Sequence, residues 1–307
     1  MDFLFQQLIN ALMTSAIYAL TASGFSLYFG VLKVLNIAHG DTCTIGIFIA
    51  MTLNSLALFS GIYQILSPGL TILLILVISV ALTGFAGVLT QISCIKPLRD
   101  APTLVVLLVT VGLAIGIPEG IRLIYPQGSN PHTFPTILST NGVHWAGVPI
   151  RYDNLLIILT GIFLFILLHL FLTKTRVGMQ IRAMAQDREA ALMMGVNLNL
   201  LYSFTFFLGA VLGAISGITY GIYYTIVRFD IGFMNGLKGF SASIVGGLGN
   251  IYGAVLGGLI FGFAETFAVA LIPHGSAFKD VISFLVIVIF LVFRPTGILG
   301  HRIYERV

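Results

Sequence analysis

Long apolar runs separated by short polar segments dominate this sequence of 307 residues. A helix needs roughly 20 apolar residues to cross about 30 Å of hydrocarbon. Nine runs approach that length, at about 4–30, 37–59, 69–94, 101–124, 153–173, 200–224, 233–248, 250–272 and 278–293. The run at 233–248 is short and rich in glycine, so it either crosses the membrane or re-enters it from one side. The pattern predicts a bundle of eight or nine membrane segments.

Composition supports one transmembrane domain over residues 1–307. Hydrophobic residues make up 58% of the chain and charged residues 8%, with a mean hydropathy of +1.04, which excludes a soluble fold. We therefore expect an all-α polytopic bundle in which some helices are short or broken. The first run lacks a basic start and a small-residue cleavage site, so it is expected to be a retained span and not a signal peptide.

Lysine and arginine predict the orientation, because loops that stay in the cytoplasm retain positive charge. If the N-terminus is outside and all nine runs cross, ten basic residues face the cytoplasm: Lys33, Lys96, Arg99, Lys174, Arg176, Arg182, Arg188, Arg294, Arg302 and Arg306. Five do not: Arg122, Arg151, Arg228, Lys238 and Lys279. This predicts a cytoplasmic loop at about 174–199, a cytoplasmic C-terminus and an external loop at about 125–152. The sequence has no stripe of basic residues interleaved with aromatic residues, so it does not suggest a nucleic-acid partner.

Two series of glycines recur at every fourth position: Gly209, Gly213, Gly217 and Gly221, and Gly112, Gly116 and Gly120. Small residues at this spacing lie on one helix face and let neighbouring backbones approach closely in a membrane. Both series therefore predict helix faces in close contact.

Two segments resemble each other within the chain, at 35–50 and 249–265. They read LNIAHGDTCTIGIFIA and GNIYGAVLGGLIFGFAE, each with Asn-Ile, then glycine, then an apolar helix of small residues. Paired broken elements of this kind occur in ion-coupled secondary transporters built from inverted repeats. Chance similarity between glycine-rich membrane segments is the competing interpretation of this repeat. An ion-coupled secondary transporter and a structural or anchoring membrane protein are therefore two functional classes that stay open.

Sequence motifs of covalent catalysis are missing. The chain has no phosphate-binding G-x-x-x-x-G-K-[ST], no H-E-x-x-H and no G-x-S-x-G. We therefore expect neither an enzyme nor a bound metal or cofactor.

Ionisable residues at membrane depth are few and usually face a bundle interior or a wet cavity. Asn36 or Asp41 could cap a helix start, or with His39 line a pathway. Lys238 could snorkel to an interface or attract a carboxylate. The candidate translocation pathway is Asn36, His39, Asp41 and Lys238.

Two other acidic groups at membrane depth have structural explanations. Glu119 follows Pro118 and can be neutralised by Arg122, three residues further along. Glu265 lies about fifteen residues into its run, where it should approach the opposite interface. A structural and a functional role are equally open for Glu265.

Several segments carry a family resemblance. Residues 189–195 spell E-A-A-x-x-x-G, which looks like the coupling-loop motif of ATP-binding-cassette importer permeases. The segments LNIAHGD at 35–41, KGFSASIVGGLGNIYGAVLGG at 238–258 and FRPTGILG at 293–300 are similar to the branched-chain amino acid permease family. The chain departs from the usual family pattern at 41–44, which reads Asp-Thr-Cys-Thr.

The resemblance implies a permease subunit in a bacterial inner membrane that translocates branched-chain or other hydrophobic amino acids. Its implied partners are a second homologous permease, two cytoplasmic ATPases that bind ATP, and an external substrate-binding protein. The chain itself would lie in the lipid bilayer. Relatives that carry urea or small amides remain an alternative.

The resemblance also assigns the loop that would couple to the ATPases: Arg182, Asp187, Arg188, Glu189, Ala190, Ala191, Leu192, Met193, Met194 and Gly195. Asp187 can cap a helix over 188–194 that Gly195 ends in the left-handed conformation. The cluster of Leu192, Met193 and Met194 suits a partner's groove. The two alanines would be small because the contact is close, and the charged residues would rim it. An amphipathic helix lying on lipid headgroups is the alternative.

Overall fold

The computed structural model describes residues 2–99, 101–136, 142–145 and 148–300. The long helices are α1 (Asp2–Leu32), α2 (His39–Phe59), α4 (Pro68–Thr90), α5 (Thr103–Ile124), α6 (Tyr152–Lys174), α9 (Leu198–Tyr224), α10 (Ile231–Gly246), α11 (Ile251–Leu271) and α12 (Lys279–Phe293). The short helical elements are α3 (Ile62–Ile65), η1 (Gln91–Ile95), η2 (Lys96–Leu98), α7 (Arg176–Gln186), α8 (Arg188–Met193) and η3 (Gly275–Phe278). Two antiparallel pairs join β1 (His132–Thr133) to β4 (Ile226–Val227) and β2 (Gly142–Trp145) to β3 (Val148–Arg151).

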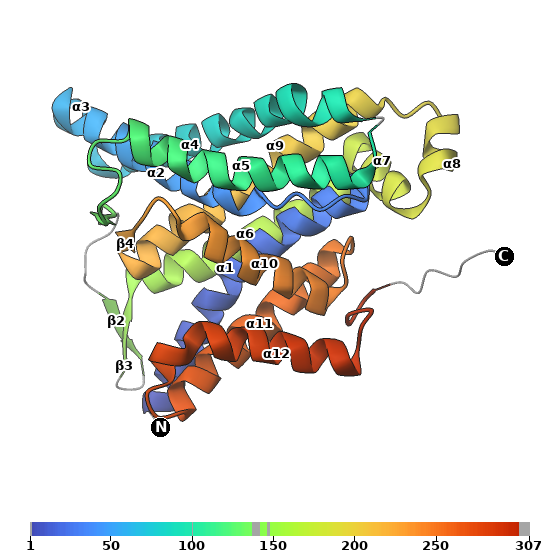
Figure 1. The fold of residues 1–307 in the computed structure, drawn as a ribbon. Coiled ribbons are helices and arrows are strands. Elements are labelled where there is room, and N and C mark those ends of the chain that lie inside the picture. Colours follow the sequence, from blue (N-terminus) through green and yellow to red (C-terminus); the bar gives the residue numbers. More distant parts are fainter. Residues whose placement is uncertain (1, 100, 137–141, 146–147, 301–307) are drawn as a thin grey trace.

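The membrane segments confirm the expected polytopic bundle. Eight helices among the described residues are long and apolar enough to cross a membrane. Helix α10 has 16 residues and falls short of that length. Figure 1 nevertheless shows α10 running from the end of the molecule that holds the strands toward the end that holds α8. It therefore carries the chain from α9 to α11 and does not turn back.

The two ends of the bundle carry different elements (Figure 1). The N-terminus and all four strands lie at one end, which we call the strand end. Helices α7 and α8 and the last turn of α12 lie at the other, which we call the α8 end. The predicted loop at 174–199 is thus a pair of short helices, and it lies opposite the predicted loop at 125–152.

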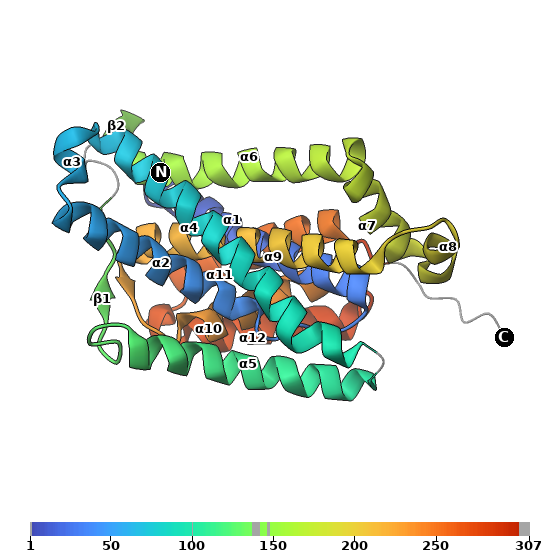
Figure 2. The same cartoon turned by 90° about the horizontal axis from the view of Figure 1, so that it is seen from above.

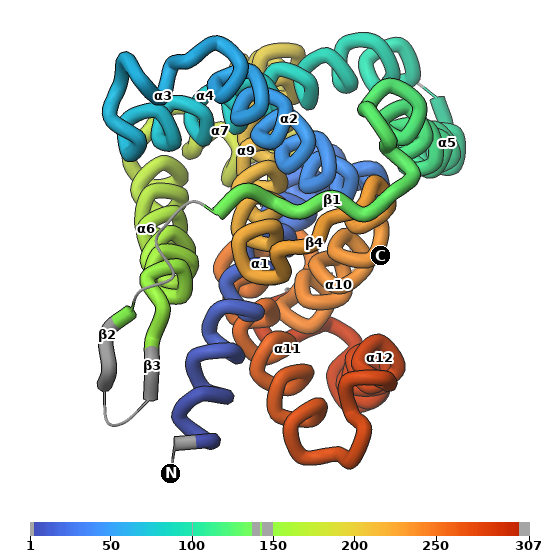
Figure 3. Tube along the Cα trace, turned by 90° about the vertical axis from the view of Figure 1, so that its left-hand side faces the viewer, coloured from blue at the N-terminus to red at the C-terminus, as the bar shows by residue number. Residues whose placement is uncertain are grey.

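Helices α1 and α9 form the centre of the bundle, with the more exposed α4, α5, α6 and α12 around them (Figures 2 and 3). The glycine series on α9 allows this packing, as predicted. A Cβ added to Gly209 would meet the Tyr28 ring on α1, and one on Gly217 would meet the Cys43 carbonyl group on α2. These glycines let three helices approach at their backbones.

The glycine series on α5 is not a packing face of this chain, so that part of the prediction is wrong. A Cβ added to Gly112, Gly116 or Gly120 would meet no described atom within 4 Å. The buried positions of α5 are Val106, Thr110, Ala114 and Pro118. These buried positions recur at every fourth residue, as the glycines do, but they are offset from the glycines by two positions. Two positions correspond to about 200° around a helix, so the glycines lie on nearly the opposite face of α5.

The inverted-repeat interpretation of 35–50 and 249–265 is also wrong. Helices α2 and α11, which these segments begin, both run from the α8 end toward the strand end (Figure 1). Elements related by inversion would run in opposite directions. The resemblance between the segments therefore gives no support to a secondary transporter.

Candidate functional site

Helix α8 begins at Arg188, as the sequence predicts. The Asp187 side chain accepts a hydrogen bond from the Ala190 amide through Oδ1 at 3.0 Å, which caps the helix. Gly195 has a φ of +79°, the left-handed conformation that glycine adopts without strain. The helix ends at Met193, one residue earlier than predicted. It is a short, defined element at the α8 end.

The apolar cluster after these charges is exposed. Met193 and Met194 are 88% and 84% exposed, and Leu192 is 39% exposed. Methionine side chains are flexible and polarisable, so they adapt to grooves of irregular shape. Arg182, Arg188 and Glu189, the charged residues predicted to rim this cluster, are also exposed. The arrangement of an apolar centre with a charged rim is the one that protein interfaces use.

Ala191 packs against the bundle of its own chain. It is only 3% exposed and packs in a core cluster of this same chain, with Ile181, Leu198 and Leu201 among its members. Its small size fits the contact between α8 and the bundle. Ala190 remains exposed.

A groove of about 510 Å³ separates α7 from α8. Met179 and Ala183 of α7 line one wall, and Ala190 and Met194 of α8 line the other. The groove is open at the α8 end, next to the exposed methionines. Its apolar walls can receive side chains from another protein.

His39 and Asp41, two of the candidate pathway residues, lie at the start of α2 inside the bundle. The His39 ring is fully buried and its Nε2 lies 3.1 Å from the carbonyl oxygen of Thr21, so the ring donates to that oxygen. The rings of Phe25 and Tyr28 pack edge-on against it, at 4.7 and 5.1 Å between centroids. These contacts fix the imidazole in one orientation.

The predicted side-chain cap of α2 is wrong. The N-cap residue is Ala38, and neither Asn36 nor Asp41 caps the helix. Both carboxylate oxygens of Asp41 and the amide oxygen of Asn36 are buried without a hydrogen-bond partner among the described residues. The start of α2 is instead held by backbone packing, with Gly40 against Gly236 of α10. Buried acceptors of this kind are uncommon and mark places where a polar ligand or water would be favourable.

Asn235 of α10 extends this group of polar residues. Its amide nitrogen lies 3.3 Å from both Thr21 Oγ1 and Cys43 Sγ, and Thr21 in turn contacts Ser216 Oγ at 2.7 Å. The amide oxygen of Asn235 has no partner among the described residues. We call the contact between α1, α2, α9 and α10 that holds Asp41, Asn235, Thr21, Ser216 and Cys43 the polar seam. Asn235 was not predicted as a pathway residue. Its position as a polar residue in a glycine-rich run was the one feature of the sequence that could have indicated it.

Lys238 lies apart from the other candidates and confirms the carboxylate interpretation instead of the snorkelling one. Its Nζ is 3.0 Å from Glu265 Oε2 on α11 and 2.8 Å from Asp280 Oδ1 on α12. The Lys238 side chain is 7% exposed. It therefore joins three neighbouring helices by charge.

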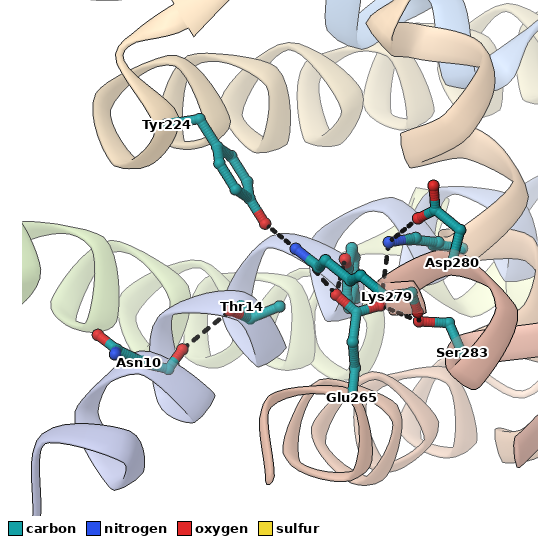
Figure 4. Close-up of polar contacts among 9 residues, drawn as sticks. Asn10, Thr14, Tyr224, Glu265, Lys279, Asp280 and Ser283 are labelled. Atoms are coloured by element: carbon teal, nitrogen blue, oxygen red, sulfur yellow. Dashed lines mark hydrogen bonds and ion pairs between the residues drawn. The ribbon is translucent and has the colours of Figure 1, made fainter. Parts of the chain in front are cut away.

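Glu265 is the centre of the charged network in Figure 4. Its carboxylate is buried and accepts a hydrogen bond from Tyr18 at 2.8 Å, a second from Ser283, and the ammonium group of Lys279 at 3.1 Å. Lys279 also donates to the Tyr224 hydroxyl group. With two lysines against Glu265 and Asp280, the charges cancel, which is how ions are accommodated at membrane depth.

A polar pocket of about 350 Å³ adjoins this network. Gln7, Asn10 and Thr14 of α1 line it together with Glu265 and Lys279. Figure 4 shows Asn10 and Thr14 to the left of the network. The predicted pairing of Glu119 with Arg122 is separate, on α5, at 2.6 Å. Opposite charges in neighbouring apolar runs were the signal that could have revealed the Glu265 network.

Together, the apolar spans and the buried ions define a multi-pass membrane protein with an exposed pair of short helices at one end. Residues 7–291 match the family described as the permease component of branched-chain amino acid transport systems. This chain belongs to that family, which makes it a transport subunit and confirms the resemblance carried by its motifs.

Relatives extend over nearly the full length. The high-affinity branched-chain amino acid transport system permease protein BraD of Pseudomonas aeruginosa is 34% identical over 306 residues, covering 98% of this chain and 97% of BraD. The corresponding protein LivH of Escherichia coli is 29% identical over 311 residues, covering 98% and 97%. Among solved structures, PsaBC from Streptococcus pneumoniae in complex with Fab aligns over 94% of this chain and 92% of that chain, with 13% identity and a TM-score of 0.48.

Proposed function

We propose that this chain is the membrane-spanning permease subunit of an ATP-binding-cassette importer that translocates branched-chain or other hydrophobic amino acids. Family membership over residues 7–291 supports a permease, and the names of BraD and LivH support this substrate class. The chain would work with a second homologous permease, two cytoplasmic ATPases and an external substrate-binding protein. ATP would bind to the ATPases, and this subunit would need no cofactor of its own.

The observation that carries the mechanism is the exposed pair of Met193 and Met194 beside the groove between α7 and α8. A rigid helix fixed by the Asp187 cap and by buried Ala191 can transmit a push from an ATPase into the bundle. Closure of the ATPases on ATP would then shift the equilibrium between outward- and inward-open permease states. The α8 end would accordingly face the cytoplasm.

Charge distribution supports that orientation in a bacterial inner membrane. The described basic residues of the α8 end include Lys33, Lys96, Lys174, Arg188 and Arg294. Cytoplasmic loops retain such residues during membrane insertion. The strand end, with the β2–β3 pair, would be the surface that receives the binding protein.

The polar seam is the best candidate for the pathway within this subunit. It offers hydroxyl, amide and carboxylate groups between backbones that approach at Gly40 and Gly236, so a small separation of α2 from α10 would open it. Weak binding along the path is expected, because a tight site in the membrane would slow release.

The test is co-purification of the ATPases with variants of the exposed methionines. Replacing both Met193 and Met194 by Asp should cost about 2 kcal/mol or more of binding if they enter a partner's groove, and should release the ATPases. The matched control replaces both residues by Leu, which keeps an apolar surface and should retain the ATPases. Wild-type amounts of ATPase on the Asp variant would refute the coupling role of α8.

A further inference from the structure

A second pocket opens at the α8 end and shares no lining residue with the groove. Its volume is about 210 Å³, and it lies where the end of α1, the η1–η2 turn, the start of α5 and the start of α9 meet α8. Four basic residues from these different elements line it: Lys33, Lys96, Arg99 and Arg188. We call it the basic pocket.

The four cations lack acidic partners in the described part of the chain. No described Asp or Glu lines the basic pocket, and none of the four takes part in an ion pair among the described residues. Like charges gathered in one pocket repel each other, which an anion between them would relieve. The pocket is therefore electrostatically complementary to an anion.

Two of the cations are held in place by specific contacts. Lys33 has a left-handed φ of +57°, and its Nζ donates to the carbonyl oxygen of Ala185 on α7 at 3.0 Å. Partial burial also lowers the pKa of Lys33, and a bound anion would offset that effect. The Arg99 guanidinium group lies over the Tyr202 ring, 5.9 Å from its centroid. The charges are thus preorganised around the pocket.

The remaining lining matches a lipid better than a free ion. Asn199 and Tyr202 add polar groups beside the cations, while Leu32, Ile95 and Val106 form an apolar wall. These apolar residues belong to the last or first turns of membrane segments, and Ile95 and Val106 are themselves buried. The pocket lies at the ends of four candidate membrane spans, and basic pockets between such helices bind anionic headgroups.

We propose that the basic pocket binds the phosphodiester headgroup of an anionic lipid, with its acyl chains along the apolar wall. The lipid connects the end of α1 and the starts of α5 and α9 to Arg188, and so supports α8. This site is independent of which amino acid the permease carries.

The test measures lipid binding to the purified full chain in detergent by native mass spectrometry. The double variant Lys96→Gln with Arg99→Gln should lose about 30-fold in affinity for phosphatidylglycerol, at about tenfold per 1.4 kcal/mol and about 1 kcal/mol per cation. The matched control, Lys174→Gln with Arg294→Gln, removes two exposed cations of the same end that do not line the pocket. Its affinity for phosphatidylglycerol should equal that of the unchanged chain, and phosphatidylcholine should bind weakly to all three.

Three results would overturn the proposal. The first is equal phosphatidylglycerol affinity for the pocket variant and the control, both monodisperse by gel filtration. The second is displacement of the lipid by inorganic phosphate as readily as by phosphatidylglycerol, which would indicate a site for free phosphate. The third is a pocket variant that keeps its lipid and loses the ATPases, which would make the basic pocket a protein-docking surface.

Asp100 provides an additional test, because it adjoins Arg99 in sequence and lies outside the described residues. Asp100→Asn should bind phosphatidylglycerol as tightly as the unchanged chain or more tightly. If lipid binds only to the Asp100→Asn variant, the natural chain neutralises its own pocket and the proposal is wrong.

Discussion

The ammonium group of Lys238 on α10 lies 3.0 Å from the carboxylate of Glu265 on α11, and their side chains are 7% and 0% exposed. Ions buried in this way are tolerated only when their charges and hydrogen bonds are met. Asp280 and Lys279 complete the balance from α12. The network therefore joins the short helix α10 to the last two helices of the bundle.

Removing Lys238 should destabilise the fold strongly. In Lys238→Met, Glu265 and Asp280 keep two negative charges against Lys279 alone, and breaking a buried pair costs about 3–5 kcal/mol. The melting temperature of the purified chain in detergent should fall clearly. The control is Arg228→Gln, which breaks an exposed pair with Asp230 worth about 0–1 kcal/mol. Equal melting temperatures for the two variants would contradict a structural role for the network.

Neutralising both partners should restore much of that stability. The double variant Lys238→Met with Glu265→Gln leaves Lys279 and Asp280, whose charges cancel. Residues in one ion network are expected to show a coupling energy of about 0.5–3 kcal/mol. A double variant that is as unstable as the sum of its two single variants would show that the two side chains act independently.

The two glycine series should respond oppositely to alanine. In Gly217→Ala the new methyl group would meet the Cys43 carbonyl group, and overpacking costs about 1–3 kcal/mol. In Gly116→Ala the methyl group meets no described atom within 4 Å, so the higher helix propensity of alanine should be neutral or stabilising by up to about 1 kcal/mol. Melting temperatures in detergent measure both. If Gly116→Ala lowers the melting temperature and Gly217→Ala does not, the face of α5 that carries Gly116 is packed inside the bundle and not on its outside.

The Asp187 cap should determine the order of α8. Asp187→Ala removes the acceptor for the Ala190 amide and costs about 0.5–2 kcal/mol, which should fray this six-residue helix. Hydrogen exchange at the amides of 189–194 should speed up, and coupling to the ATPases should weaken. Asp187→Ser supplies another capping oxygen and should keep slow exchange. Slow exchange in both variants would mean that packing of Ala191, and not the cap, orders α8.

The membrane spans were predictable because a bilayer imposes a length on every crossing segment. The same reasoning left α10 undecided, since 16 residues reach only about 24 Å at 1.5 Å per residue. Its course through the bundle is determined by packing against α1, α2 and α11, which no local pattern contains. The cap and glycine stop of α8 were predictable because they involve neighbouring residues only.

Contacts between segments that are distant in the chain were harder to predict from the sequence. The glycine series on α5 and α9 have the same spacing, and only the fold shows that one series is packed and the other is not. For Lys238 the sequence left two interpretations open, snorkelling to an interface or attracting a carboxylate. Its two carboxylate partners follow it by 27 and 42 residues (265 − 238 and 280 − 238), too far for a local pattern to identify them. The start of α2 looked like a capped helix, because the tight approach of Gly40 to Gly236 has no signature in either segment alone.

The most direct test of the account is leucine uptake into proteoliposomes that contain this chain, its partner permease and the ATPases, with the binding protein outside and ATP inside. The account predicts uptake that requires ATP and the binding protein, is lost when Met193 and Met194 are both replaced by Asp, and persists when both are replaced by Leu. Uptake by this chain alone, driven by a proton or sodium gradient without ATP, would contradict it.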